Sequence, residues 1–562
     1  MKTRVTRRAF IGTTLGSSAA LLSGGLSSLV TRSASAAGNW IEATIPQLQA
    51  LMNSGALTSA QLVTNYLNQI ASLNPLLHAI IETNPDALSI AQTRDKERKQ
   101  GKIRGPFHGI PVVVKDNLAT KDKMQTTAGS LALVGSTVAS DSAVVAKLRA
   151  AGAVVLGKAN LSEWANFRGN APFNGWSARG GFTRDPYLLS FDPCGSSSGS
   201  AVAAAANMCA TTVGTETDGS VVCPSGNNLN FGLKPTVGLV SQDGIIPIAH
   251  SQDTAGPMCR SVTDVAIMLG VMQSPFGPVT GKSVPSDYTQ FLKLGSLKGA
   301  RIGVDSRYFA NSYGGENDLV KVAQNGIDAM QSLGATIVPT DTGNPFQQNF
   351  KFYNDEFTVL LYEFKVQIAQ YLAPLGNTTM RTLADLIAFD IAHCEEEMKY
   401  FGQEVFDAAQ LTSGNLNDPI YLQARQDNLT FARTNGIDAA IKKDNLDAIV
   451  APTYSFASSL PAVAGYPNFS IPVGLTPEGK PAGLWMYSGF LKEPKLIALA
   501  YDLEQAIKPR VQPGFLGTVP PEPPDAGICA SLSTAPTSAQ SLLVNGRGVT
   551  TRHLGTGKPL SP

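Results

Sequence analysis

The sequence predicts an α/β fold, in which short strands and helices are layered around a large core. Short apolar runs rich in valine and isoleucine, typical of buried strands, alternate along the chain with segments of helical periodicity. The chain has 562 residues, of which 43% are hydrophobic and 15% are charged. This apolar content is sufficient for one large domain or for several domains of ordinary size.

The first part of the chain, residues 40–100, is expected to be helical. Leu62, Tyr66 and Ile70 recur there at helical spacing, and Thr58 precedes them in a position to cap the helix. Strands and helices then alternate. We expect, in chain order, a strand at 108–114, a helix at 144–151, a strand at 152–156, a helix at 201–208 and a strand at 210–214.

The second half of the chain is poorer in glycine and more helical between residues 283 and 440. This region is expected to form a lobe over the site or an insertion. Apolar runs predict further strands at 300–304, 335–338, 446–451, 471–473 and 483–486.

The N-terminus is expected to be an export signal of the twin-arginine (Tat) type, residues 1–36. Arg7 and Arg8 precede a mildly apolar stretch that reaches about Val30, and Ala34-Ser35-Ala36 offers a cleavage site. Glycine, serine and threonine dilute the stretch, so we expect no stable membrane anchor. A disordered basic tail is the alternative. We therefore expect the Tat machinery as a partner and a periplasmic or secreted mature protein.

The C-terminal residues 511–562 are rich in proline, serine and glycine, most densely at 520–524 (PPEPP). This composition predicts an extended or disordered tail without a packing pattern. The segment between signal and tail, residues 37–510, is then the folded domain.

The net charge and the cysteine content argue against two classes of protein, nucleic-acid binders and structural zinc proteins. The formal net charge is +1, which gives no support to nucleic-acid binding. The six cysteines form no CxxC pair or Cys/His cluster, which argues against structural zinc. Cys194 and Cys223 flank two Gly/Ser loops. They are expected to be small packing residues, with a disulfide as the alternative.

The first Gly/Ser loop contains a Gly-x-Ser-x-Gly run, residues 195–199, with Ser197 at its centre. Such a run marks the nucleophile of α/β-hydrolases when it follows a central strand. Here Pro193 stands where that strand should end, which disfavours this reading. No histidine lies in a pattern that would serve as the base.

Lys115 is the better candidate for a general base. It ends the apolar run 112–114, and burial would lower the pKa of its amine into a useful range. The alternative is a lysine that reaches the surface or pairs with Asp116. Ser220 is the candidate nucleophile, and Ser196 would relay the proton from Ser220 to Lys115.

The second Gly/Ser loop supplies candidate donors for an oxyanion. The successive backbone N–H groups of Thr217, Asp218, Gly219 and Ser220 can converge into an anion-binding nest. Ordinary turns are the alternative for both Gly/Ser loops. A carboxylate at Asp218 is unusual beside such a nest, and we expect it to point away and cap backbone groups.

These segments resemble the amidase signature family, strongly over residues 105–260 and more loosely to about residue 505. Supporting runs are GKANLSEW at 157–164, GLKPT at 232–236, GLV at 238–240 and SQDTAGP at 251–257. The resemblance implies a central mixed, twisted sheet surrounded by helices, and no metal or cofactor. It also implies Lys115 as base, Ser196 on a cis peptide as relay, and Ser220 as the acylated nucleophile.

The departures from the common pattern are informative. The second loop reads ETDGS at 216–220 where the family commonly has DTGGS, a variant similar to the branch that contains bacterial peptide amidases. The segment 225–230 (SGNNLN) departs from the small apolar residues usual in that branch, and we expect it to alter the pocket or its packing.

The expected reaction is hydrolysis of an amide C–N bond through an acyl-enzyme, with release of ammonia or an amine and with C-terminal peptide amides as candidate substrates. Alternatives are esterase or aryl acylamidase activity, and a catalytically silent binding protein. The amidotransferase subunit of the family is disfavoured by the export signal. Six aromatic residues form either an apolar acyl pocket or core: Trp176, Phe352, Tyr353, Phe357, Tyr362 and Phe364.

Overall fold

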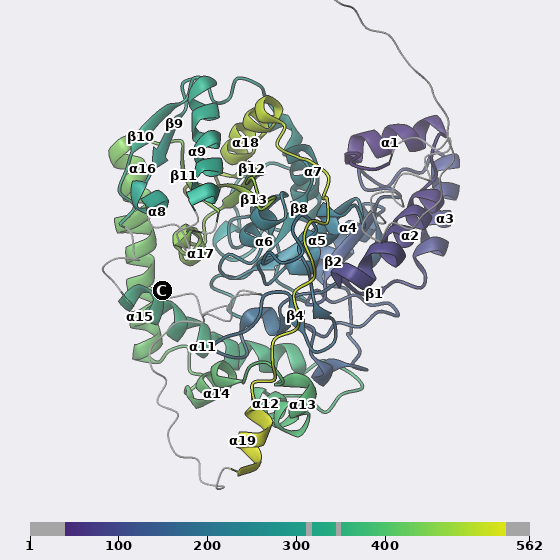
Figure 1. The fold of residues 1–562 in the computed structure, drawn as a ribbon, viewed down its shortest axis with the longest axis vertical. Helices are drawn as coiled ribbons and strands as arrows, with labels where there is room; N and C mark the ends of the chain where they lie inside the picture. The colour runs from purple at the N-terminus through teal and green to yellow at the C-terminus, as the bar shows by residue number, and fades with distance from the viewer. Residues whose placement is uncertain (1–39, 311–316, 344–349, 454, 535–562) are drawn as a thin grey trace, which may run out of the picture. The chain divides into compact units, whose positions relative to one another are not determined.

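The computed structural model describes residues 40–534 apart from 311–316, 344–349 and 454. Its centre is a sheet of 11 strands in the order β1-β3-β2-β6-β8-β7-β12-β13-β11-β9-β10 (Figure 1). The strands are β1 (Ile80–Thr83), β2 (Pro111–Lys115), β3 (Val154–Ala159), β6 (Thr211–Glu216), β7 (Phe231–Lys234), β8 (Thr254–Cys259), β9 (Arg301–Val304), β10 (Thr336–Pro339), β11 (Ala448–Pro452), β12 (Asn468–Leu475) and β13 (Pro481–Tyr487).

The sheet is mixed. Strands β3, β2 and β6 are parallel to one another, as are β11, β9 and β10, whereas the pairs between β6 and β11 are antiparallel. A separate two-stranded hairpin consists of β4 (Trp176–Ser177) and β5 (Gly181–Phe182). The predicted α/β fold with a central mixed sheet is confirmed.

Every strand predicted from the sequence is present, but β1, β7 and β8 of the sheet and the hairpin strands β4 and β5 were not predicted. Strand β8 has neighbours on both sides and contains Pro257, which lies opposite Val213 of β6. Proline is rare in such an inner strand because it cannot donate a hydrogen bond. The run TAGPMC therefore lacks a strand pattern, and its long-range pairing decides its conformation.

Helices cover the N-terminal half of the sheet, and all of them except α6 and α7 lie in regions where a helix was predicted. They are α1 (Ile45–Ser54), α2 (Ser59–Leu77), α3 (Ala87–Lys99), α4 (Ala143–Ala150), α5 (Ser198–Ala205), α6 (Val222–Asn227) and α7 (Val262–Met272). Thr58 caps α2, and Gln61 bonds back to complete a capping box.

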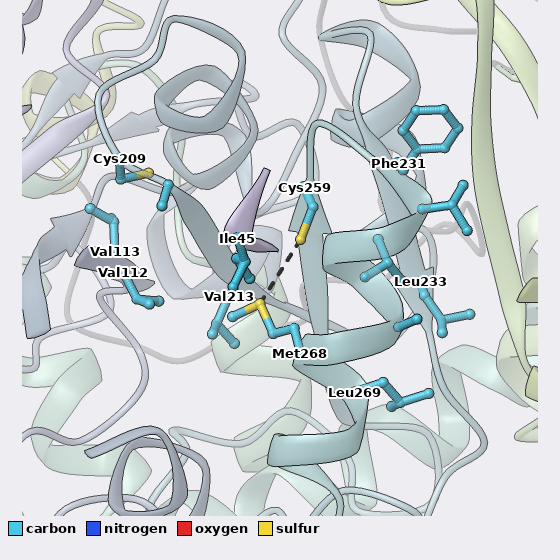
Figure 2. Packing of buried hydrophobic residues seen from close by; sticks show 14 of the residues in the cluster. Ile45, Val112, Val113, Cys209, Val213, Phe231, Leu233, Cys259, Met268 and Leu269 are labelled. Carbon is cyan, nitrogen blue, oxygen red and sulfur yellow. Dashed lines mark hydrogen bonds between the residues drawn. The ribbon is translucent and has the colours of Figure 1, made fainter. Parts of the chain in front are cut away.

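The main core lies where α7 packs against the central strands. Figure 2 shows Met268 and Leu269 of α7 beside Val213 of β6 and Leu233 of β7, with the Cys259 thiol against the Met268 sulfur. Helix α5 is buried over its whole length. A Cβ on its Gly199 would lie 2.4 Å from the Ala79 carbonyl, so only small residues allow this helix to approach β1 and β3 so closely.

The middle of the chain is helical, as predicted. Its longest helix is α11 (Phe350–Leu372), which packs with α12 (Leu383–Ala392), α14 (Glu404–Leu411) and α15 (Pro419–Leu429). The remaining helices include α8 (Ser306–Ala310), α9 (Asn317–Ser332), α13 (Cys394–Glu397), α16 (Asp438–Asp444), α17 (Ser459–Ala464), α18 (Glu493–Ile507) and α19 (Ile528–Thr534). Among the described residues, no helix combines the length and apolar character that a bilayer span needs.

The C-terminal segment packs on the body, which its composition did not predict. After α18 it runs extended along the molecule to α19, in yellow in Figure 1. Arg510 binds Glu42, Leu516 forms a β-bridge with Leu188, and a disulfide joins Cys529 to Cys394. Backbone pairing and one covalent bond thus hold a segment whose sequence lacks an apolar pattern for packing. The predicted signal at 1–36 and residues 535–562 of the predicted tail lie outside the described residues.

Candidate active site

Lys115 lies at the end of β2 and its side chain is fully buried. Its Nζ donates to Ser196 Oγ at 2.7 Å and to Thr215 Oγ1 at 3.0 Å. Burial lowers the pKa of Lys115 to about 7, although the nearby carboxylates of Asp253 and Glu216 act in the opposite direction. A lysine with this pKa is partly unprotonated at neutral pH and can accept a proton.

The two alternatives for Lys115 are wrong. A fully buried amine does not reach the surface. Asp116 instead faces two other cations, at 4.0 Å from Lys158 and 3.5 Å from Arg179, and accepts from the Thr127 hydroxyl at 2.5 Å.

Ser196 lies in the loop before α5, and the Gly195–Ser196 peptide bond is cis. Its hydroxyl accepts from Lys115, and its carbonyl accepts from the Ser162 N–H at 3.0 Å. A Cβ at Gly195 would lie 2.3 Å from Ser162 Oγ, so glycine is required at this close approach. The side chain of Ser196 is thereby directed at Lys115.

Ser220 follows β6 and is 8% exposed, unlike the fully buried Lys115 and Ser196. The Ser197 N–H donates to the Ser220 carbonyl at 3.3 Å, which joins the two Gly/Ser loops. Within the described part of the chain, the Ser220 hydroxyl makes no hydrogen bond. The structure therefore brings the three predicted residues into one region and joins Lys115 to Ser196 directly, whereas Ser220 adjoins them through the backbone.

The loop 217–220 presents unused backbone donors. None of its four N–H groups donates to any residue that the structure describes. The next two N–H groups, of Val221 and Val222, are taken by the Glu216 carboxylate at 2.8 and 3.0 Å. Gly219 has φ of +77°, a left-handed conformation that favours glycine. Free donors in such a turn can bind an anion.

The Asp218 side chain points away from these donors, as expected, but it caps no backbone group of the residues that the structure describes. Its carboxylate accepts from the hydroxyls of Ser458 at 3.0 Å and Ser459 at 2.6 Å. Burial raises the pKa of this carboxyl, while the two serine hydroxyls lower it. The partners lie some 240 residues away in sequence, so no local pattern could have indicated them.

The Ser197 side chain is not exposed, as the nucleophile of an elbow would be. Its hydroxyl donates to the Thr215 carbonyl at 3.0 Å and accepts from the Thr215 N–H at 3.2 Å. The side chain is fully buried and serves to join the first loop to β6.

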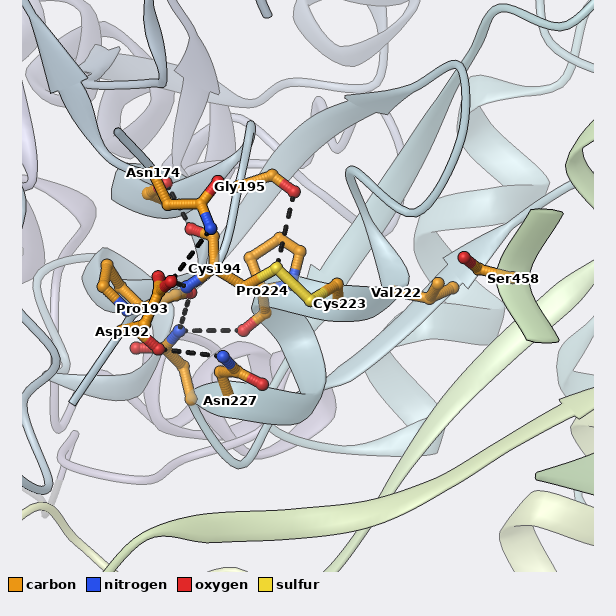
Figure 3. Close-up of a disulfide and its surroundings, with 12 residues drawn as sticks. Asn174, Asp192, Pro193, Cys194, Gly195, Val222, Cys223, Pro224, Asn227 and Ser458 are labelled. Carbon is orange, nitrogen blue, oxygen red and sulfur yellow. Dashed lines mark hydrogen bonds between the residues drawn. A yellow bond between two sulfur atoms is a disulfide. The ribbon is translucent and has the colours of Figure 1, made fainter. Parts of the chain in front are cut away.

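Cys194 and Cys223 form a disulfide, so their interpretation as separate packing residues was wrong (Figure 3). Helix α6 begins two residues after Ser220, and this brings Cys223 to a Cα distance of 5.9 Å from Cys194, within the usual range for a disulfide. The bond ties the loop of Ser196 to the helix that follows Ser220.

Side chains of the unusual segment 225–230 hydrogen-bond to the backbone on both sides of Ser196. The Asn227 amide donates to the Asp192 carbonyl at 2.8 Å, and the Asn228 amide donates to the Pro193 carbonyl at 3.0 Å. Asn230 donates to the Ala201 carbonyl at 2.7 Å. The asparagines therefore satisfy buried carbonyl groups on either side of Ser196, which accounts for their presence where small apolar residues are usual.

Sequence reasoning missed several residues around the site. Thr215 accepts from Lys115 and from the Asn117 amide, and Asp253 accepts from the Thr217 hydroxyl at 2.6 Å. Gln252 donates to Glu356 and to the Thr217 carbonyl. The run SQDTAGP indicated that residues 252 and 253 matter, but not what they contact.

The chain matches known proteins over most of its length. The family model named Amidase matches residues 61–460. The chain belongs to the amidase signature family. A probable amidase of Arabidopsis thaliana is 41% identical over 485 residues, which cover 84% of this chain and 92% of the relative. The protein is accordingly an amidase, an enzyme that hydrolyses amide C–N bonds.

Two crystal structures are similar to this amidase. One is a peptide amidase in complex with the competitive inhibitor chymostatin, at 46% identity and a TM-score of 0.78, covering 84% of this chain and 99% of the other. The second is the native peptide amidase of Stenotrophomonas maltophilia, at 45% identity and a TM-score of 0.77 with the same coverage.

A small recess opens beside strand β6 of the amidase. Thr215, Glu216 and Thr217 line one side, and the apolar run 245–248 lines another. Three of the predicted pocket aromatics instead belong to the core: Phe352 and Phe364 are 2% and 1% exposed, and Trp176 packs on Phe401. The core alternative is correct for these three residues.

Proposed function

We propose that this amidase works through a Ser-Ser-Lys triad and an acyl-enzyme. Lys115 is the general base, Ser196 relays the proton and Ser220 attacks the carbonyl carbon. The observation that carries this proposal is the 2.7 Å contact of Lys115 Nζ with Ser196 Oγ in a fully buried setting. A buried amine with a pKa of about 7 is matched to proton transfer near neutral pH.

The reaction has two steps. Ser220 Oγ adds to the amide carbonyl while its proton passes to Ser196 and the Ser196 proton passes to Lys115. The negative carbonyl oxygen is held by the free N–H groups of residues 217–220, called the oxyanion loop below. The C–N bond then breaks, and the lysine proton leaves with the ammonia or amine. Water adds to the ester and repeats the relay, which releases the acid and restores Ser220.

The proposed substrates are C-terminal amides of peptides. The similar crystal structures are peptide amidases by name, and one of them holds a competitive inhibitor, chymostatin. The recess beside β6 offers an apolar wall at 245–248 and polar groups from Thr215 to Thr217, a combination suited to a side chain next to an amide.

Hydrolysis of a panel of amides and esters tests the function: amide cleavage is followed by the release of ammonia or amine, and ester cleavage by the release of acid. The panel contains peptide C-terminal amides, fatty amides, aryl amides and matched esters, each with wild type and with Lys115→Ala. We expect release from peptide amides to be fastest and to be abolished in the variant. Faster turnover of esters would favour an esterase. No turnover of any substrate by wild type would favour a silent binding protein.

We also propose that residues 1–36 direct export by the Tat route. The twin arginine and the two disulfides support this, because disulfides persist in oxidising compartments. Cell fractionation tests the proposal: changing Arg7 and Arg8 to lysine should retain the protein in the cytoplasm. Equal amounts of exported protein with and without the change would refute it.

A further inference from the structure

One residue, Gln252, connects helix α11 to the oxyanion loop. Glu356 of α11 is 5% exposed, and its Oε1 accepts from Gln252 Nε2 at 2.8 Å. The same Nε2 donates to the Thr217 carbonyl at 3.4 Å. We infer that Glu356 is a positioning residue, which acts through Gln252 to orient the oxyanion loop. This inference rests on the proposed function, because it assigns the loop its oxyanion role.

Peptide geometry explains how a contact on a carbonyl affects a donor. The carbonyl of Thr217 and the N–H of Asp218 belong to one planar peptide unit and point in opposite directions. A hydrogen bond that holds the Thr217 carbonyl therefore holds the direction of the Asp218 N–H. That N–H is one of the free donors proposed for the oxyanion.

The hydrogen bond from Gln252 to the Thr217 carbonyl is longer than the other bonds that hold the loop. Other parts of the loop are held by shorter bonds, from the Thr217 hydroxyl to Asp253 at 2.6 Å and from the Cys223 N–H to the Gly219 carbonyl at 2.7 Å. At 3.4 Å, the bond of Gln252 lies beyond the usual range, and a small displacement of the amide removes it. Glu356 determines where the amide lies.

The chemical state of Glu356 suits a test by substitution. Burial raises the pKa of this carboxyl well above its ordinary value and the neighbouring Asp218 raises it further, whereas the hydrogen bond from Gln252 and the charge of Arg425 lower it. The side chains of Glu and Gln have the same size, and the amide of Gln keeps an accepting oxygen. Glu356→Gln can therefore preserve the bond to Gln252, and Glu356→Met, of similar length, removes it.

The affinity for a peptide aldehyde tests the inference. Addition of Ser220 to the aldehyde creates an oxygen in the oxyanion position, whereas the product acid binds without that addition. In Glu356→Met we expect aldehyde affinity and kcat to fall by about 10- to 100-fold, since small misplacements have effects of this size. KM, product affinity and the melting temperature should change much less. Glu356→Gln should restore most of the loss.

A double-mutant cycle with Gln252→Leu completes the experiment. If Glu356 acts through Gln252, the double variant Glu356→Met/Gln252→Leu is no worse than Gln252→Leu alone. Independent losses that multiply, or a Glu356→Gln variant as weak as Glu356→Met, would overturn the inference. A different result would show that the proposed function itself is wrong: in that case Ser220→Ala would bind the aldehyde as tightly as wild type.

Discussion

Lys115 Nζ and Ser196 Oγ lie 2.7 Å apart, and both side chains are fully buried. The amine also donates to Thr215 Oγ1 at 3.0 Å. The arrangement isolates one basic nitrogen in a place where the charged form is unfavourable.

Substitution of Lys115 should therefore abolish proton transfer. We expect Lys115→Met to lower kcat by about 10²- to 10⁴-fold, the usual contribution of a general base. Lys115→Arg is the sharper variant, because arginine keeps the positive charge but does not release its proton in proteins. Steady-state ammonia release measures both. An active arginine variant would show that the charge, and not the base, is needed.

The pH dependence of kcat/KM should follow the titration of Lys115. Below its pKa of about 7 the amine carries a proton and cannot serve as base, so activity should rise with pH through that value and level off above it. A profile that is flat between pH 5 and 9, on a substrate whose chemistry limits the rate, would contradict the assignment.

Substitution of the serines in the two loops should have different effects on turnover and stability. Ser220→Ala should abolish both turnover and labelling by an active-site acylating reagent, because it removes the attacking oxygen. Ser197→Ala removes only the bonds to Thr215 and should lower the free energy of unfolding by about 1–3 kcal/mol. Mass spectrometry of the labelled protein locates the acyl group; a label on Ser197 would reverse the two roles.

The disulfide between Cys194 and Cys223 should support both stability and turnover. Replacement of both cysteines by serine should lower the free energy of unfolding by about 2–4 kcal/mol, because the 29-residue connection is no longer closed. We also expect a lower kcat, since the bond links the loop of Ser196 to the helix after Ser220. Guanidinium unfolding and kinetics measure the two effects. Unchanged kinetics would confine the bond to a stabilising role.

The disulfide between Cys394 and Cys529 provides the matched control, since it lies in the C-terminal segment and α13. Replacing this pair by serine should leave kcat unchanged and should expose residues 508–534 to limited proteolysis. Cleavage sites are mapped by mass spectrometry. Equal protease resistance of the variant and wild type would show that Arg510 and the bridge at Leu516 hold the segment without the covalent bond.

Local patterns were sufficient to predict much of the architecture. The apolar runs around Val112, Val155 and Ile449 became β2, β3 and β11, because buried strands need continuous apolar residues. Thr58 was recognised as a cap from its own chemistry. Strand β8 was missed because its pairing with β6 and β7 overrides its unfavourable composition.

The sequence alone established the α/β fold, the family resemblance and the three candidate residues, because each depends on short runs whose meaning is local. Only the tertiary structure decided which groups meet. The contacts around the site join segments that are 29 to 241 residues apart. They are the disulfides of Cys194 and Cys529, the hydrogen bonds of two serine hydroxyls to Asp218, and the hydrogen bond of Gln252 to Glu356. Such contacts depend on the order of strands in the sheet and on helix packing, which no short run of residues specifies.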